Sequence, residues 1–214
     1  MGLIVQIIVS IAVCVAAGYA FYMYFSKQGL LTKKNNIIYC VVVQLLIAAA
    51  LLYRYMGLCK TDFFGMINHF VILECTALVT VTDFRKQIIP NRIMLMALYL
   101  RGLLLIPEFI VFREDILSIL IRNLVACIVP TVLLIMGLLI MKNSIGMGDV
   151  KLLFIIALFS DFLFVFNALF YALVVAFIVS VVLLLTKKIK AKGTIAFAPF
   201  LLVGVYLAVI LNVS

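Results

Sequence analysis

An aspartate that follows two glycines is the most distinctive polar residue of this chain: Asp149, in Gly146-Met147-Gly148-Asp149-Val150-Lys151. The glycines remove side chains just ahead of the acid, so another part of the backbone can approach it closely. A second carboxylate, Asp83, ends an apolar run earlier in the chain. Two carboxylates that share a site do not both ionise readily, so one activates a water molecule while the other donates a proton. This is the chemistry of an aspartic protease.

Other common hydrolytic sites have no counterpart in the sequence. There is no H-E-x-x-H zinc motif and no G-x-S-x-G nucleophile motif, and the single histidine, His69, lies in the outer half of a predicted span. The five cysteines are scattered among apolar residues without a C-x-x-C pair, which favours small buried side chains over disulfides or a zinc site. We therefore expect a reaction that uses neither a metal nor a cofactor.

The elements that would position the two aspartates are membrane helices. Of the 214 residues, 68% are hydrophobic and 12% are charged, and the mean hydropathy is +1.38. This composition predicts an all-α polytopic membrane protein with one membrane domain, residues 1–214. Apolar runs lie at 3–25, 37–58, 63–82, 92–112, 121–141, 164–186 and 194–213. An eighth run, 150–161, is shorter than the roughly 20 residues that a span needs, so it is either a tilted short helix or half of a broken one. We predict about eight transmembrane helices.

The lysines and arginines indicate how these helices are oriented. With the N-terminus outside, the inner connections hold 12 basic residues and the outer ones hold four. The inner residues are Lys27, Lys33, Lys34, Arg85, Lys86, Arg92, Lys142, Lys151, Lys187, Lys188, Lys190 and Lys192, and the outer ones are Arg54, Lys60, Arg113 and Arg122. An excess of basic residues on the cytoplasmic side predicts that both termini lie outside. Asp83 and Asp149 then share the cytoplasmic face at a similar depth, and the net charge of +9 is expected to meet anionic lipid rather than nucleic acid.

Three motifs in this order resemble those of type IV prepilin peptidases. The segment 83–91, DFRKQIIPN, is similar to the family's first aspartate motif, and 146–153, GMGDVKLL, matches its GxGD motif. The segment 196–201, AFAPFL, is similar to the Pro-Phe-rich stretch that opens the last helix of these proteins. The resemblance extends over residues 83–202, and we expect the protein to lie in the plasma membrane.

This resemblance implies an aspartic endopeptidase that cuts the basic leader from prepilins or pilin-like precursors at the cytoplasmic membrane face. Many members carry paired C-x-x-C motifs in an N-terminal cytoplasmic segment and also methylate the new N-terminus. The corresponding connection here, 26–36, is short and has no cysteine, so we expect peptidase activity without methylation. Two alternatives are a membrane assembly factor or small transporter without enzymatic activity, and an intramembrane protease of the presenilin kind.

Helix ends suggest how the two aspartates divide their roles. Asp149 begins a predicted helix, where the positive end of the helix dipole favours the anion, whereas Asp83 ends one, where the negative end favours the protonated form. We therefore expect the resting proton on Asp83. As an alternative to catalysis, both acids would be ordinary interfacial charges that pair with Lys151 and Arg85.

The remaining polar residues have structural interpretations beside functional ones. Lys151 suits a snorkelling interfacial position, and Pro90, followed by Asn91, suits the first turn of a helix. Pro199 is either a tolerated early-helix proline or part of a substrate cleft. Glu74 and Arg101 lie at matched depths on consecutive spans, which predicts a buried ion pair between them. The oligomeric state and the identity of the substrate do not follow from the sequence.

Overall fold

The computed structural model describes residues 16–20, 22–24, 26–27, 33–54, 63–86, 88–139, 146–186 and 196–211. The bounded elements of this part of the chain are all helices: α2 (Lys33–Tyr53), α3 (Phe63–Lys86), α4 (Asn91–Val111), α5 (Ile116–Ala126), α6 (Ile128–Leu139), α7 (Met147–Phe159), α8 (Phe162–Leu185) and α9 (Ala198–Leu211). Four apolar segments are long enough to cross a membrane: Phe63–Arg85, Asn91–Val111, Ile116–Leu133 and Phe162–Leu185. The chain is therefore an all-α polytopic membrane protein, as the composition predicts. Most of the predicted first span, 3–25, lies outside the described residues.

The segment Ile116–Leu133 confirms a span here, but it begins earlier than the predicted 121–141 and contains a turn at Cys127. The structure has two helices there, α5 and α6, which begin at Ile116 and break at Cys127. The helix starts earlier than the apolar run because Ser118, Arg122 and Asn123 share one face of α5, and that face lines a polar cavity. A helix needs only one apolar stripe when its other face borders a polar space.

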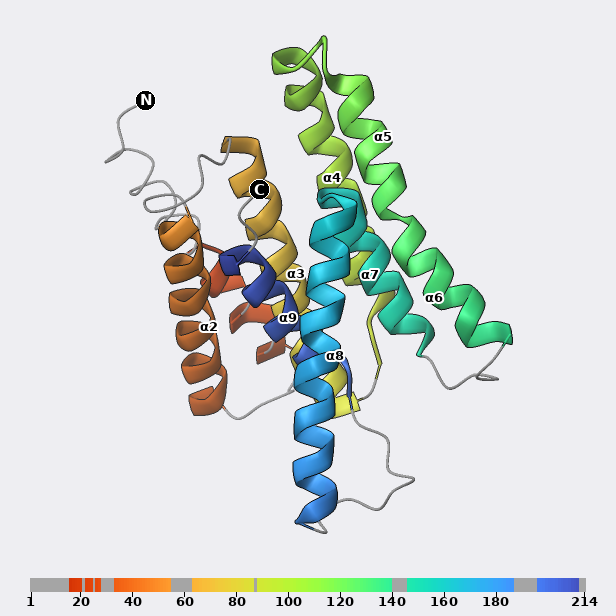
Figure 1. The fold of residues 1–214 in the computed structure, drawn as a ribbon. Coiled ribbons are helices and arrows are strands. Elements are labelled where there is room, and N and C mark those ends of the chain that lie inside the picture. The colour runs from red at the N-terminus through yellow and green to blue at the C-terminus, as the bar shows by residue number, and fades with distance from the viewer. Residues whose placement is uncertain are drawn as a thin grey trace.

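From α3 onward the elements run alternately down and up the bundle (Figure 1). α3 descends, α4 rises, α5 and α6 descend together, α7 rises, α8 descends and α9 rises. The end of α3 and the starts of α4, α7 and α9 therefore face the lower part of the bundle in this view, whereas the start of α3 and the end of α7 face the upper part. The two aspartate motifs are thereby brought to the same side of the bundle.

α7 is the short helix that the sequence left undecided. Its 13 residues span about 20 Å, less than the roughly 30 Å hydrocarbon core of a bilayer. The helix packs against α3, α4, α5, α6 and α8, and seven of its residues are buried. A helix that is apolar on all sides is stable when neighbouring helices enclose it. α7 is thus an internal helix of the bundle.

The last two helices pack closely because small residues face one another. A Cβ atom added to Gly204 of α9 would lie 2.2 Å from the carbonyl oxygen of Ala168 and 2.8 Å from the Cβ of Ala172, both on α8. Small residues let membrane helices approach until their backbones touch. This contact fixes the position of α9 and therefore of its first turn, which lies in the candidate site described below.

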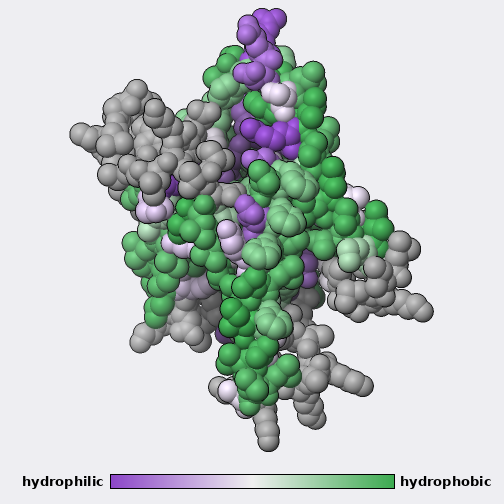
Figure 2. Space-filling model, in the orientation of Figure 1, coloured by the Kyte–Doolittle hydropathy of each residue, from purple (hydrophilic) through white to green (hydrophobic). Residues whose placement is uncertain are grey.

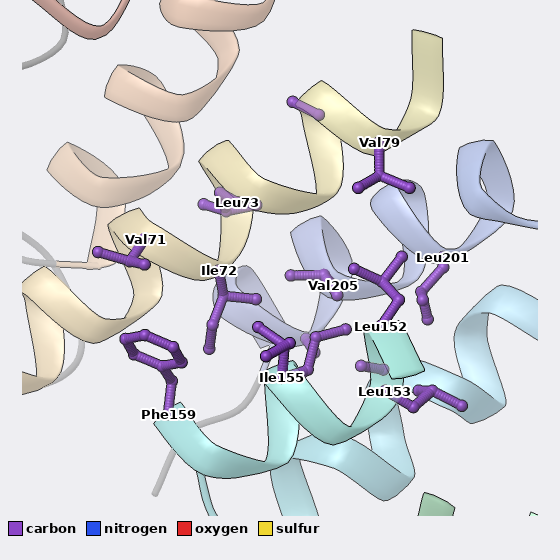
Figure 3. Close-up of a cluster of buried hydrophobic side chains, with 14 of the residues drawn as sticks. Val71, Ile72, Leu73, Val79, Leu152, Leu153, Ile155, Phe159, Leu201 and Val205 are labelled. Carbon is purple, nitrogen blue, oxygen red and sulfur yellow. The ribbon is translucent and has the colours of Figure 1, made fainter. Parts of the chain in front are cut away.

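The core between the two ends of the bundle is apolar. Ile72 and Val79 of α3, Leu152 and Ile155 of α7, and Val205 of α9 are drawn together in Figure 3, and all are at most 6% exposed. On the outside, Figure 2 shows hydrophobic surface over most of the helices, with hydrophilic residues gathered near the upper end. Exposed large apolar side chains on most of the helices are what a bilayer-facing surface requires.

Candidate active site

Asp83 and Asp149 reach the same site from different helices. Asp83 lies in the last turn of α3 and is 6% exposed. Asp149 lies in the first turn of α7 and is half-buried, ahead of the apolar residues of that helix. Burial raises the pKa of the Asp149 carboxyl, and the negative charge of the neighbouring Asp83 raises this pKa further. The two carboxyls are thus close enough to interact, as a shared site requires.

The first turn of α9 supplies a partner for Asp83 that the sequence analysis did not identify. The backbone N–H of Ala198 donates a hydrogen bond to Oδ2 of Asp83 at 3.1 Å. Thr80, one turn earlier on α3, donates through its hydroxyl to the carbonyl oxygen of the same Ala198 at 3.3 Å. Two hydrogen bonds therefore join the end of α3 to the start of α9 beside the carboxyl groups.

This contact favours a division of roles opposite to the one expected from the helix ends. Ala198 is the first residue of α9, and amides at a helix N-terminus stabilise an anion. Asp83 thus accepts a hydrogen bond that favours its charged form, whereas burial and the charge of Asp83 raise the pKa of Asp149 to about 6. The expected placement of the proton on Asp83 weighed each aspartate only against the dipole of its own helix and left this contact out, so it stays a prediction.

The two glycines before Asp149 leave space that a side chain would fill. A Cβ atom on Gly146 would lie 2.7 Å from Oδ2 of Asp149, and one on Gly148 would lie 3.0 Å from the side chain of Ile89. Ile89 belongs to the connection between α3 and α4. The glycines therefore let the carboxyl fold back over the start of α7 and let the 88–90 segment approach it.

The remaining motif residues border this site. Pro90 is the N-cap of α4, one residue before the helix, and Pro199 is the second residue of α9. Lys151 donates from Nζ to Oδ1 of Asn91 at 3.4 Å, which links the start of α7 to the start of α4. Lys151 and Asn91 are both exposed, so their contact lies at the rim of the site.

The predicted ion pair between Glu74 and Arg101 is wrong. Arg101 Nη1 pairs with Oε1 of Glu108 at 2.8 Å, and Glu74 accepts from Nε2 of Gln44 on α2 at 3.1 Å. The depths along the membrane matched, but Glu74 faces α2 rather than α4. Glu108 lies seven residues after Arg101, which returns it to the same face of α4 after two turns.

Comparisons with known proteins agree with the motifs. The model of the type IV leader peptidase family matches residues 70–185, which is more than half of the chain and includes both aspartates. The chain belongs to the type IV leader peptidase family. No curated protein and no solved structure matches it. In this leader peptidase the contact from Ala198 lies beyond the matched residues, so α9 contributes a part of the candidate site that the family match does not cover.

A backbone amide leaves little trace in a sequence. Nothing in the residue type of Ala198 predicts a hydrogen bond to Asp83, although the motif at 196–201 marked the neighbourhood through Pro199. Ile89 was quoted only as part of a motif, and its packing on Gly148 depends on the tertiary fold.

Proposed function

We propose that this leader peptidase is an aspartic endopeptidase whose catalytic residues are Asp83 and Asp149. The observation that carries the proposal is the coupling of these two carboxyls, which come from helices 60 residues apart and are close enough for one charge to raise the pKa of the other. A like-charged pair does not stabilise a fold. An aspartic protease needs such a pair because one proton is shared between two acids.

The hydrogen bond from Ala198 suggests which acid is the base. The Asp83 carboxylate accepts a proton from a water molecule as the water oxygen bonds to the carbonyl carbon of the substrate. Asp149 donates its proton to the carbonyl oxygen, which gives a neutral gem-diol. Asp83 then delivers the accepted proton to the leaving nitrogen, the carbon–nitrogen bond breaks, and a gem-diol hydroxyl returns a proton to Asp149. Both acids end in the protonation states in which they began.

The proposed substrate is a prepilin or a pilin-like precursor with a short basic leader before an apolar helix. The proposed cleavage face is cytoplasmic, with both termini of the enzyme outside, because the basic residues favour that topology. A bond just before a membrane-inserted helix lies at the membrane interface, where the starts of α4 and α7 would place the carboxyls. We also propose that the enzyme does not methylate the product, because the connection 26–36 has no paired cysteines.

The test is cleavage of a co-expressed prepilin by the wild type, Asp83→Asn and Asp149→Asn in isolated membranes. We expect the wild type to produce mature pilin whose new N-terminus lies just before the apolar helix, and both variants to accumulate without cleaving. A new N-terminus inside the apolar helix would assign a presenilin-like activity instead. Full cleavage by either variant would exclude the dyad.

A further inference from the structure

A polar cavity of about 450 Å³ lies at the end of the bundle opposite Asp83 and Asp149. His69, which lines it, precedes Asp83 by fourteen residues on α3, so the two levels are about 21 Å apart. Its charged lining consists of three arginines and three carboxylates: Arg54, Arg101, Arg122, Glu108, Asp115 and Asp161. Ile72, Leu73 and Val79, which belong to the apolar cluster of Figure 3, lie between His69 and Asp83 along α3, so the two polar regions are separate.

The deepest charges of the cavity are held in place by the helices around it. Arg54 is 6% exposed and donates from Nη1 to the carbonyl oxygen of Val209 on α9 at 2.8 Å. Arg101 is 4% exposed, pairs with Glu108, and lies over the ring of Phe159 with 5.5 Å between its guanidinium carbon and the ring centroid. Buried arginines fixed in this way present preorganised donors.

Two buried polar atoms in the lining have no hydrogen-bond partner within the described residues. One is Oε2 of Glu108, whose side chain is almost fully buried, and the other is Nδ1 of His69, whose ring packs on Phe164 at 4.9 Å between centroids. A buried carboxylate oxygen without a donor is costly in free energy. Among the described residues Oε2 of Glu108 thus lacks a donor, and an occupant of the cavity with an N–H or O–H group would supply one.

The charge balance narrows the chemistry of that occupant. With three guanidinium groups against three carboxylates, a simple anion or cation would meet as many like charges as opposite ones. A ligand that carries a positive and a negative group a few ångströms apart can pair with both the carboxylates and the arginines. The volume lies within the range of small-molecule sites, about 300–1,000 Å³.

The bilayer supplies such a ligand. Around the cavity, α5 exposes Leu117, Ile121 and Leu124, and α8 exposes Leu163 and Phe166. These side chains give acyl chains an apolar surface beside a polar cavity. Phosphate suits arginine because the planar guanidinium donates two parallel hydrogen bonds. A primary ammonium has N–H groups that can donate a hydrogen bond to Oε2 of Glu108. The quaternary ammonium of choline has no N–H group.

We propose that this cavity binds the headgroup of a phospholipid with a primary amine, such as phosphatidylethanolamine. The phosphate meets the arginines and the ammonium donates to Oε2 of Glu108. The proposal does not depend on the peptidase chemistry, because no residue is shared between the two sites.

The experiment is thermal unfolding of the delipidated full chain in detergent, with added phosphatidylethanolamine, phosphatidylcholine or phosphatidylglycerol of identical acyl chains. At about 100 times the Kd we expect phosphatidylethanolamine to raise Tm by roughly 5–10 °C, with smaller shifts for the other two. Equal shifts for all three lipids, which a water-filled cavity would give, would overturn the proposal. An equal Tm shift from soluble glycerophosphoethanolamine at the same concentration would contradict the claim that the ligand is a membrane lipid.

Variants separate the two charges of the headgroup. Glu108→Gln should abolish the preference for phosphatidylethanolamine over phosphatidylcholine. Arg122→Gln, at an exposed position where folding is not at risk, should reduce the Tm shift from every phospholipid, and an undiminished shift would contradict the role of the phosphate. Asp83→Asn is the matched control and should respond to lipid as the wild type does, although it is expected to have lost cleavage.

Discussion

At the first turn of α7, Asp149 lies beside a carboxyl of the same charge, whereas beyond its last turn the cavity combines carboxylates with arginines. Both regions are polar sites in an apolar bundle, and both draw residues from α3 and α7. The charges of the cavity are opposite, and Arg101 pairs with Glu108, although Oε2 of Glu108 has no partner among the described residues. Those of the candidate active site repel, and among the described residues the amide of Ala198 donates to Asp83. This difference supports the proposal that the first pair is kept for its chemistry.

The largest expected effect is on the cleavage rate, which should depend on the carboxylate at the start of α7 but not on the one beyond its end. Asp149→Asn should reduce cleavage by about 10²–10⁴-fold, because the general acid is lost. Asp161→Asn is the matched change at the other end, where the carboxylate caps α8 by accepting from the N–H of Phe164 at 2.7 Å. It should keep the cleavage rate within a few-fold. The rates are measured on a co-expressed prepilin and normalised to enzyme in the membrane, and similar losses in both variants would remove the contrast.

The next effect is on the free energy of unfolding, and it concerns the ion pair between Arg101 and Glu108 in the cavity. Arg101→Leu should destabilise the protein by about 3–5 kcal/mol because it leaves Glu108 charged, buried and unpaired. The double change Arg101→Leu with Glu108→Leu should be less harmful than Arg101→Leu alone. Chemical unfolding in detergent measures both.

Glu74 provides the control for that pair. Because it bonds to Gln44 rather than to Arg101, Glu74→Gln combined with Arg101→Leu should be additive within about 0.5 kcal/mol. A coupling energy well above this value would support the ion pair between Glu74 and Arg101 that the sequence predicts.

A smaller effect tests how the position of α9 supports the candidate active site. Gly204→Val should destabilise the protein by about 1–3 kcal/mol, because the added side chain meets the backbone of α8. It should also lower cleavage by moving Ala198 away from Asp83. Gly102→Ala is the control, since a Cβ there has no neighbour within 4 Å, and it should be neutral or stabilising by up to about 1 kcal/mol. Equal stability and equal cleavage in the two variants would argue against the close α8–α9 contact.

The smallest expected effect is a shift in the pKa of Asp149. In Asp83→Asn the pKa of Asp149 should fall, because the neighbouring charge is removed, but it should stay above the ordinary value of about 3.9, because burial is the larger cause. The ¹³C shift of the labelled carboxyl, followed with pH, measures this. An unchanged pKa would mean that the two carboxyls do not interact.

The same raised pKa sets the sign of a pH dependence. The folded state binds the Asp149 proton more tightly than the unfolded chain does, so this contribution to stability is fully present below the unfolded pKa. It is lost as the pH rises through the folded pKa. Asp149→Asn should remove this part of the pH dependence of unfolding.

The sequence predicted the elements and the two aspartates better than it predicted contacts. Apolar runs marked most of the helices because lipid-facing and buried residues are both hydrophobic, and the family motifs marked Asp83 and Asp149. The early start of α5 at Ile116 was missed because polar residues that face a cavity look like the end of a span. The partner of Arg101 was missed because depth follows from residue number, whereas the direction in which Glu74 points depends on how α3 is rotated in the bundle.

The shortness of α7 also affects where the membrane voltage acts. If water reaches the cavity on one side and the carboxyls on the other, the potential falls across about 20 Å of apolar packing rather than about 30 Å, so the local field is steeper. Moving one charge through the whole potential takes about 2.3 kcal/mol per 100 mV. In the proposed topology Asp83 and Asp149 lie at the inner edge of that layer, and their protons come from the cytoplasm without crossing it. Cleavage by this enzyme should therefore proceed at the same rate in energised and de-energised membranes.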